Sequence, residues 1–550
     1  MRRRLLMAST SRDSKNVKDY LTVVAIEDGL TITPTLHGGC VYFEYCINGS
    51  MEWMPLQSGV ATPAVNSGDT ISLKAEIIPE VSGSGHIAIS KKCNLEGNCM
   101  SILYGGKASA KKNVPQYAFL ELFHGNTTIC GVSESFLPAT QLDGQCYVSM
   151  FKGCTSMVSA PALPAEAIDY YCYEEMFSGC TSLLSAPALP ATTLFTGCYK
   201  SMFKDCTALT TAPALPADTL AKECYNNMFK GCTALIEAPA LSATTLGVSC
   251  YSSMFENCTS LVVAPELPAN TLVSACYYLM FKDCTSLVSA PALPALQISS
   301  YCYYGMFENC TYLKSAPKLP ATSLGYYCYS NMFKNTSLTE APELPATILT
   351  EGCYSGMFRR CRSLKTAPAL PAVTLNVHCY SYMFYECTSL TSASDLPANV
   401  LTEYCYYQMF AYCQSLTTAP TILATKASIQ SCKNMFYGCV TLKYSPDLHF
   451  TELSEESLYG MFRECSALTS APALPATTLA TSCYNYMFNG CTSLSYIKAL
   501  FTTTPGNSYT NKWMEGVASS GTFVKNSAAT WDVVGISGIP EGWTVETADA

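Results

Sequence analysis

The chain has 550 residues, a formal net charge of −9 and only 13% charged residues. This balance argues against a nucleic-acid partner, because proteins that bind phosphate backbones normally present a basic face. The one basic cluster, Arg2 to Arg4, lies in a polar N-terminal segment, residues 1–19, which we interpret as solvated chain.

Neither a membrane span nor a secretion signal is recognised in the sequence. The longest uncharged run, residues 284–307, is interrupted by Pro291 and Pro294 and therefore does not predict a transmembrane helix. The apolar stretch after the arginines ends at Ser9, so it is too short for the apolar region of a signal peptide. We expect no membrane insertion.

Residues 20–104 have the composition of a β domain. Runs rich in β-branched and aromatic residues at 21–26, 41–45, 70–77 and 86–89 are separated by Asp-Gly, Asn-Gly and Ser-Gly turn signals. Short strands at this spacing predict a small β-sandwich. Its cysteines form two pairs, each with five intervening residues, namely Cys40, Cys46, Cys93 and Cys99. Zinc hairpins usually use about two to four, so we predict no metal site.

From residue 105 to residue 500 the chain repeats one pattern of about 26 residues. Fourteen full repeats follow a degenerate first one at Leu122-Phe123, and one of them is a residue short. A fixed period in this range predicts a solenoid, in which neighbouring repeats bury each other's apolar faces. Each full repeat is marked by a Met-Phe pair, whose methionines are Met150, Met176, Met202, Met228, Met254, Met280, Met306, Met332, Met357, Met383, Met409, Met435, Met461 and Met487.

Each repeat predicts one short helix and one short extended segment. Apolar residues recur every four positions from Leu194 to Cys206, which is typical of one helical face, and Thr193 offers an N-cap hydroxyl. The Ala-Pro-Ala-Leu-Pro segment that follows is extended, as residues before proline prefer. Because proline cannot donate to a strand ladder, we expect only about two or three paired residues per repeat.

The period ends at about residue 500. β-prone runs at 521–524, 531–534 and 543–545 then predict a small C-terminal β-rich cap, residues 501–550, over the last repeat.

Thirty-one cysteines would suggest disulfides, but their placement argues otherwise. Twenty-six lie in the repeats, in one column about four residues before the Met and another four residues after it. On a helix these sites would lie about 12 Å apart, beyond disulfide reach. The columns also fail independently, since Cys328 has no second-column partner. We interpret the cysteines as buried, reduced, small apolar residues. Disulfide ladders between repeats remain the alternative.

The sequence contains no recognisable catalytic or cofactor-binding pattern. The five histidines are scattered, and a thiolate nucleophile would need an electropositive setting that the apolar cysteine columns lack. We therefore predict that the protein is not an enzyme and binds no cofactor.

The two positions before each Met vary from repeat to repeat, and tyrosine is frequent there. Tyrosine gives a large contact area at a low entropic cost, so we predict an exposed ligand-binding row on one face of the solenoid. The alternative is that these are merely tolerated surface residues. The row consists of Tyr278, Tyr304, Tyr382, Tyr407 and Tyr486.

The repeated pattern M-F-x-x-C-T-S-L-x-x-A-P-x-L-P-A-T-T-L resembles the BspA-like leucine-rich repeats of surface proteins from gut bacteria and of proteins encoded by their phages. The family's usual Ala-Phe pair has become Met-Phe here, and the leader of secreted members is missing. With this resemblance the predicted fold class is an α/β solenoid, leucine-rich-repeat-like, flanked by the β-sandwich and the cap. The resemblance implies adhesion or binding, without catalytic residues.

These features together predict a recognition protein on a phage particle, in its tail or host-contact apparatus, that binds a glycan or protein on a cell surface. Assembly in the cytoplasm would fit the missing leader and the unpaired cysteines. The alternatives are a bacterial cell-surface adhesin and a purely structural spacer. The expected location is the virion or the cell surface, and a homo-oligomer or virion partner would attach through the N-terminal domain.

Overall fold

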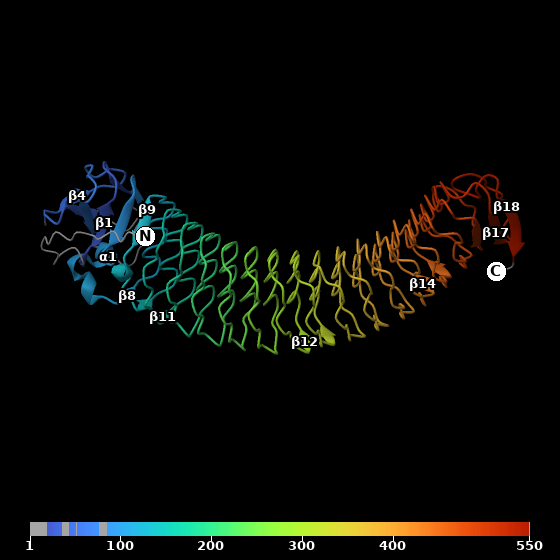
Figure 1. Cartoon of the computed structure of the whole chain (residues 1–550), viewed down its shortest axis with the longest axis horizontal. Coiled ribbons are helices and arrows are strands. Elements are labelled where there is room, and N and C mark those ends of the chain that lie inside the picture. The colour runs from blue at the N-terminus through green and yellow to red at the C-terminus, as the bar shows by residue number, and fades with distance from the viewer. Residues whose placement is uncertain (1–18, 36–42, 51, 76–84, 549–550) are drawn as a thin grey trace, which may run out of the picture. The chain divides into compact units, whose positions relative to one another are not determined.

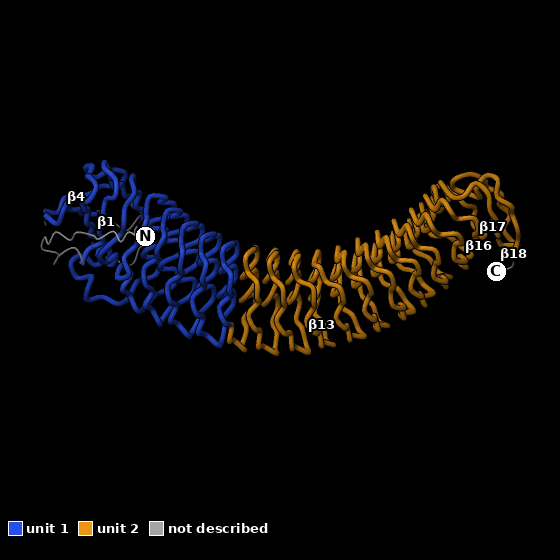
Figure 2. Tube along the Cα trace, in the orientation of Figure 1, with its two compact units in different colours: residues 1–240 blue, residues 241–550 orange. Residues whose placement is uncertain are grey.

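The computed structural model describes residues 19–35, 43–50, 52–75 and 85–548 (Figure 1). The chain forms two compact units, residues 1–240 and 241–550 (Figure 2). The first unit contains the non-repeating N-terminal sheets and the first repeats, and the second contains the remaining repeats and a C-terminal sheet. The N-terminal segment up to residue 18 and Cys40 lie outside the described residues.

Two sheets make up the N-terminal part of the first unit. The larger has the strand order β4-β3-β5-β1-β7-β9, with antiparallel neighbours except for the parallel pair β7–β9, and the smaller pairs β2 with β6. Val23 of the central strand β1 is fully buried, and the buried hydroxyls of Thr22 and Ser72 bond each other across the sheet at 2.9 Å. The strands are β1 (Leu21–Ala25), β2 (Ile32–Thr35), β3 (Phe43–Ile47), β4 (Met54–Leu56), β5 (Thr70–Lys74), β6 (His86–Ile89), β7 (Cys93–Glu96) and β9 (Ile129–Val132).

The strands predicted for this region are present. The runs at 21–26, 70–77 and 86–89 contain β1, β5 and β6, and the described part of the run at 41–45 lies in β3. Strand β9 lies in the segment that leads into the repeats. Its pairing with β7 therefore joins the larger sheet to the repeat region inside the first unit.

Helical structure is confined to short segments before the full repeats. Among the described residues, α1 (Ser101–Tyr104) is the only α-helix, and the 3-10 helices η2 (Gly105–Ala110) and η3 (Glu134–Phe136) follow it. Two-residue strands β8 (Asn113–Val114), β10 (Gln141–Leu142) and β11 (Ala167–Ile168) form a parallel ladder in the order β11-β10-β8. The ladder is short and gapped, as predicted, but its paired residues lie after the proline segment, at the positions where the helix was expected to begin.

The helix predicted in each repeat is wrong: the segment is a run of four-residue turns. The amides of Lys200, Met202 and Lys204 donate to the carbonyls three residues back, at 3.1, 3.2 and 3.2 Å. The amides between them, those of Ser201 and Phe203, instead donate to carbonyls of the next repeat at 2.8 and 2.9 Å. Half of the amides thus close turns and half bond the neighbouring repeat, so the fold is a nearly helix-free β-solenoid rather than an α/β solenoid.

A left-handed residue at every fourth position makes this geometry possible. The backbone φ angles of Gly197, Ser201 and Asp205 are 65°, 55° and 59°. A spacing of four residues repeats without drift in such turns, whereas in an α-helix of 3.6 residues per turn each step of four rotates the side chain by about 40°. The strict four-residue period from Leu194 to Cys206 therefore suits the turns better than the predicted helix. The predicted N-cap at Thr193 has no helix to cap.

The core consists of side chains that stack on their equivalents in the neighbouring repeats. In both units the tyrosine after the first-column cysteine and the phenylalanine after the Met are fully or almost fully buried. In the first unit the rings of Tyr173 and Tyr199 lie 5.6 Å apart and those of Phe177 and Phe203 lie 5.7 Å apart, both nearly parallel. Offset parallel rings at this distance attract each other beyond their burial, so each repeat positions the next.

The cysteines serve this core in two different ways. The described cysteines form no disulfide, and all except Cys130 are buried. Second-column thiols donate to phenylalanine carbonyls, as Cys206 does to Phe177 at 3.1 Å and Cys310 to Phe281 at 3.0 Å. The predicted separation of about 12 Å between the two cysteine columns assumed a helix and does not apply. The cysteines are buried, as predicted, but they are not only small apolar residues, because their thiols act as hydrogen-bond donors.

The second unit repeats this architecture and ends in a longer parallel sheet. Its two-stranded ladders are β12 (Gln297–Ile298) with β13 (Ser323–Leu324) and β14 (Lys426–Ala427) with β15 (Glu452–Leu453). The sheet β16-β17-β18 consists of Tyr496–Ala499, Thr522–Asn526 and Thr544–Ala548.

The region predicted as a cap continues the repeat pattern. Trp513 takes the place of the repeat phenylalanine: its carbonyl accepts from the Phe488 amide at 2.9 Å, and its buried indole donates to the Gly538 carbonyl at 3.0 Å.

Candidate recognition surface

The left-handed turns leave one surface of each repeat open to variation. Three positions per repeat are left-handed, and in the repeat around Met306 they hold Tyr301, Gly305 and Asn309, with φ of 60°, 56° and 62°. We name these positions and the residues between them, where not buried in the core, the turn surface. In the second unit this surface carries three clusters of tyrosines.

The first cluster joins two pairs of stacked rings. The rings of Tyr278 and Tyr304 lie 5.1 Å apart, and those of Tyr301 and Tyr327 lie 5.6 Å apart. Tyr301 and Tyr304 connect the pairs at 6.2 Å. The Tyr327 hydroxyl donates to Glu351 at 2.8 Å, and burial together with this bond raises the pKa of Tyr327 to about 12. Tyr327 is therefore neutral at physiological pH.

The second cluster is larger and its rings are tilted rather than parallel. Tyr382 contacts Tyr385 at 5.9 Å and Tyr407 at 5.2 Å, both edge to face. Tyr385 also lies edge to face with Tyr412 at 5.7 Å, and Tyr404 lies 5.9 Å from Tyr407. The rings thus present edges and faces in several directions on one surface.

The third cluster contains Tyr437, Tyr459 and Tyr486. The rings of Tyr459 and Tyr486 lie 5.4 Å apart, and the guanidinium of Arg463 lies over Tyr437 at 5.2 Å and over Tyr486 at 5.4 Å. The ammonium of Lys433 lies over Tyr459 at 4.6 Å. Cations over aromatic faces at these distances are attracted by the rings.

The five tyrosines predicted as a ligand-binding row are all on the turn surface, but they do not form a uniform exposed row. Each is half-buried, and they divide among the clusters. Tyr278 and Tyr304 lie in the first, Tyr382 and Tyr407 in the second, and Tyr486 in the third.

Sequence reasoning missed the other members of the clusters. Six of them precede the first-column cysteine or follow the Met by two or three residues, whereas Tyr459 stands two residues before Met461, at one of the positions from which the row was drawn. The column of Gly, Asn and Asp three residues after the Met is a sequence signal for left-handed backbone, and it could have located this surface. The missed tyrosines are Tyr301, Tyr327, Tyr385, Tyr404, Tyr412, Tyr437 and Tyr459.

Arg359 stands out among the charged residues of this surface. Its guanidinium lies over the ring of Tyr382 at 5.3 Å and over that of Tyr385 at 4.9 Å. Its Nε is buried and has no hydrogen-bond partner among the described residues, and none of their carboxylates lies within 4.0 Å of it. By contrast, Arg360 and Arg362 both bond Glu386, at 3.2 and 2.8 Å.

The paired arginines determine the state of the nearby carboxylate. Burial raises the pKa of Glu386, but the bonds from Arg362 and Arg360 outweigh it and lower the pKa overall. Glu386 is therefore ionised and neutralises part of the arginine charge. Among the described residues, Arg359 keeps two aromatic neighbours and has no carboxylate within 4.0 Å.

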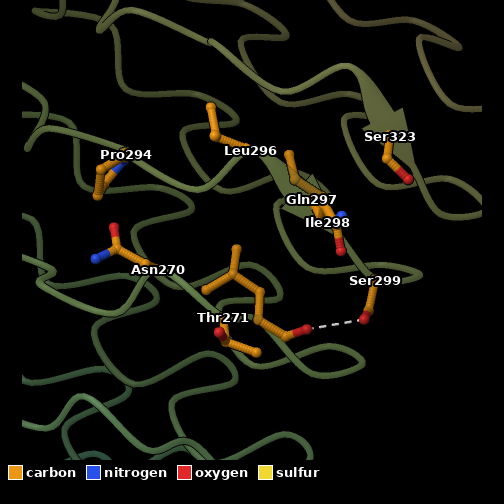
Figure 3. A pocket seen from close by; sticks show the side chains of 9 residues that line it. Asn270, Thr271, Pro294, Leu296, Gln297, Ile298, Ser299 and Ser323 are labelled. Carbon is orange, nitrogen blue, oxygen red and sulfur yellow. Dashed lines mark hydrogen bonds between the residues drawn. The ribbon is translucent and has the colours of Figure 1, made fainter.

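A groove of about 650 Å³ lies elsewhere in the second unit, beside the ladder β12–β13 (Figure 3). Its lining is uncharged, and the Ser299 hydroxyl that faces it already donates to the Leu272 carbonyl at 2.8 Å. It offers apolar contact through Leu296, which is 63% exposed, and amide groups from Asn270 and Gln297. Its lining residues include no histidine, cysteine, lysine or carboxylate.

The thiols are also unsuited to catalysis. Burial raises the pKa of Cys361 to about 11, and burial likewise raises the pKa of the other column cysteines whose values shift. They are protonated at neutral pH, whereas a nucleophile needs the thiolate. The described residues contain no group of three His, Cys, Asp or Glu positioned to hold a metal ion. In that same part of the chain, none of the helices has the length and hydropathy that a membrane crossing requires.

The stacked turns and buried ring columns define a repeat solenoid whose variable surface suits binding. The chain belongs to the BspA type leucine rich repeat family: the model of that repeat region, with six copies, matches residues 147–288, 242–365, 297–443 and 407–511. These ranges cover about two thirds of the chain. The family is one of surface and adhesion-type proteins and is typically non-catalytic. No curated protein and no solved structure matches the chain.

Proposed function

We propose that this protein is a non-enzymatic recognition protein that binds a cell-surface glycan through the tyrosine clusters of its turn surface. The observation that carries the proposal is the gathering of half-buried tyrosines at positions where the fold itself needs none. Equivalent positions in most other repeats hold Ser, Asn or Gly. At the left-handed positions Tyr382 and Tyr486, Asn or Gly would suit the backbone better than tyrosine does. Aromatic faces and edges of this kind stack on the C–H faces of sugar rings, and their hydroxyls bond sugar hydroxyls.

Several weak contacts on adjacent repeats can act together. A polymeric ligand that reaches two clusters converts the second contact into an intramolecular one, which raises its avidity by orders of magnitude. A surface polysaccharide, with its own repeating units, suits this arrangement.

The test replaces the five half-buried tyrosines with serine and measures attachment to host cells or to their purified surface glycans. Matched control variants are Tyr312→Ser and Tyr444→Ser, because these tyrosines are 64% and 65% exposed and no ring contact involves them. We expect the fivefold variant to lose attachment and the controls to keep it. Circular dichroism and the melting temperature check that all variants fold. Attachment that survives in the fivefold variant would move the site to the groove beside Leu296, to the proline segments or to the N-terminal sheets. The replaced residues are Tyr278, Tyr304, Tyr382, Tyr407 and Tyr486.

We further propose that the protein is displayed on a phage particle, as part of the tail or host-contact apparatus. Free thiols that donate hydrogen bonds to core carbonyls suit assembly in a reducing cytoplasm, where disulfides are rare. A bacterial surface adhesin and a structural spacer are the alternatives. Mass spectrometry of purified phage particles and of cell-envelope fractions separates the first two. A spacer would show no difference in attachment between the fivefold variant and the controls.

A further inference from the structure

Within the second cluster, we propose that Arg359 forms the centre of a site for a carboxylated sugar, so that the glycan bound by this protein is acidic. The inference rests on the proposed function and narrows its ligand. The three arginines of one repeat differ in whether they have an acidic partner. Arg360 and Arg362 share Glu386, whereas Arg359 has no acidic partner among the described residues.

The surroundings of Arg359 strengthen its attraction for an anion. The guanidinium lies in the corner formed by the rings of Tyr382 and Tyr385, whose planes meet at 68°. These rings remove water from the cation without neutralising it. A partly desolvated charge gains more from an opposite charge than an exposed one does.

The charge balance favours a carboxylate over a phosphate. Because Glu386 occupies the two neighbouring arginines, the site offers one planar, unpaired guanidinium rather than a cluster of cations. The guanidinium fork matches the flat carboxylate, with which it forms paired hydrogen bonds. A dianionic phosphate would bind better to several converging cations, but in this repeat Arg360 and Arg362 are already paired with Glu386.

The rings around the site supply the remainder of a sugar-binding surface. Tyr407 lies 5.2 Å from Tyr382, and Tyr412 lies 5.7 Å from Tyr385, so aromatic surface extends from the arginine over the two following repeats. A sugar whose carboxylate reaches Arg359 can place its ring against these tyrosines. Hexuronic acids and sialic acids both carry such a carboxylate.

The third cluster provides an internal control. Arg463 also lies over two tyrosine rings, and its Nε, like that of Arg359, makes no hydrogen bond with the described residues. Unlike Arg359, it has a carboxylate within ion-pair distance: its Nε is 3.8 Å from Glu464, which also accepts a hydrogen bond from the Tyr437 hydroxyl at 3.2 Å. A ligand carboxylate would have to compete with Glu464 there.

The experiment measures binding of the full chain by calorimetry or biolayer interferometry to defined probes. The probes are polygalacturonate and its carboxyl-reduced form, and sialyllactose with lactose as its neutral counterpart. We expect at least one acidic probe to bind, and its neutral form to bind about tenfold or more weakly. The two pairs distinguish a hexuronic from a sialic acid.

Arg359→Gln should abolish this preference, with a loss of about 10- to 100-fold for the acidic probe, whereas Arg463→Gln should leave it within about twofold. If Arg359→Gln fails to fold, Arg359→Lys keeps the charge but not the planar fork and should lose most of the preference. Equal binding of acidic and neutral probes, or equal effects of the two arginine variants, would overturn the carboxylate site. The proposed function would survive that result as long as the fivefold tyrosine variant still loses cell attachment. Dextran sulfate that binds as tightly as the acidic sugars would also overturn it, since it would indicate general anion attraction.

Discussion

The same side chain plays two roles in the second unit. In the buried column from Tyr251 to Tyr406, tyrosine rings lie 5.7 to 6.1 Å from their neighbours and within 20° of parallel. In the second cluster on the turn surface, the tyrosine pairs are 5.2 to 5.9 Å apart and tilted by 55° to 79°. The regular column follows from a residue that is the same in every repeat from Tyr251 to Tyr406. The irregular clusters follow from residues that change between repeats, and such a surface can be specific for a ligand.

The largest effect should come from breaking the column. Tyr329 is 1% exposed and stacks on Tyr303 and Tyr354, each at 5.7 Å. Tyr329→Ala should lower the free energy of unfolding by about 3–5 kcal/mol, because it creates a cavity and removes two ring contacts. Denaturant unfolding followed by circular dichroism measures it. Tyr312→Ala, at an exposed site, should change the value by less than about 0.5 kcal/mol. Equal losses for both would mean that the column does not support the fold.

The thiols that line the core should be reduced and unreactive in the native state. All but one of the described cysteines are buried, and burial raises the pKa of most of them, so thiolate is scarce at neutral pH. A thiol-specific chromogenic reagent should react with few sites in native protein, and with most of the 31 cysteines once the protein is unfolded without reductant. Fewer than about ten reactive thiols after unfolding would indicate disulfides between repeats and contradict the reduced core.

A smaller change in the same tyrosine column should stabilise the protein rather than destabilise it. The hydroxyl of Tyr354 is buried and has no hydrogen-bond partner among the described residues, although its ring completes the stack. Removing that hydroxyl in Tyr354→Phe should stabilise the protein by about 1 kcal/mol, because an unpaired buried polar group is lost. The melting temperature measures it. Destabilisation by a similar amount would reveal a bond to an ordered water molecule.

The charge of the second cluster should not change near neutral pH, so the pH dependence of glycan binding should come from the ligand. Burial, followed by the influence of Tyr407, raises the pKa of Tyr382 to about 12, so this ring stays neutral well above physiological pH. Burial lowers the pKa of His378, against the opposing effects of Glu351 and Glu403, so His378 is neutral at pH 7. Since the pKa of Glu386 is lowered and this carboxylate stays ionised, affinity for an acidic sugar should stay constant between about pH 7 and pH 9.

Affinity should fall only below about pH 4, where the carboxylate of the sugar takes up a proton. Dissociation constants measured across this range test the expectation. A marked loss between pH 7 and pH 9 would show that another titrating group controls the site.

The sequence carried enough information to predict the solenoid and its core, but not the local backbone. The period of 26 residues and the recurring Tyr199, Met202 and Phe203 predict stacked repeats with these side chains inside. A spacing of four residues is shared by a helical face and by a run of four-residue turns, and the helix was the wrong choice between them. The glycines and asparagines three residues after the Met, such as Gly231 and Asn257, indicated the turns.

The candidate site was only partly predictable for a different reason. The five tyrosines beside the Met were found because their positions vary visibly along the repeat. Tyr385 and Tyr412 join them only because adjacent repeats bring the rings within 6 Å. The unpaired state of Arg359 depends on Glu386 turning to Arg360 and Arg362 instead, and no one-dimensional pattern distinguishes these three arginines.

The four-residue count of the turns has a consequence for protein engineering. In the repeat that is one residue short, the left-handed positions Tyr327, Asn331 and Asn335 keep their spacing, and the next set begins at Gly352. The length change therefore falls between Thr336 and Leu338. The Thr336 hydroxyl donates to the Phe333 carbonyl at 2.8 Å in the place normally held by a cysteine. Foreign peptides should accordingly be tolerated at this point of a repeat, between the last turn and the buried leucine. A single residue inserted among the turns would shift every later side chain in that repeat from its column, and the stack would have to break there.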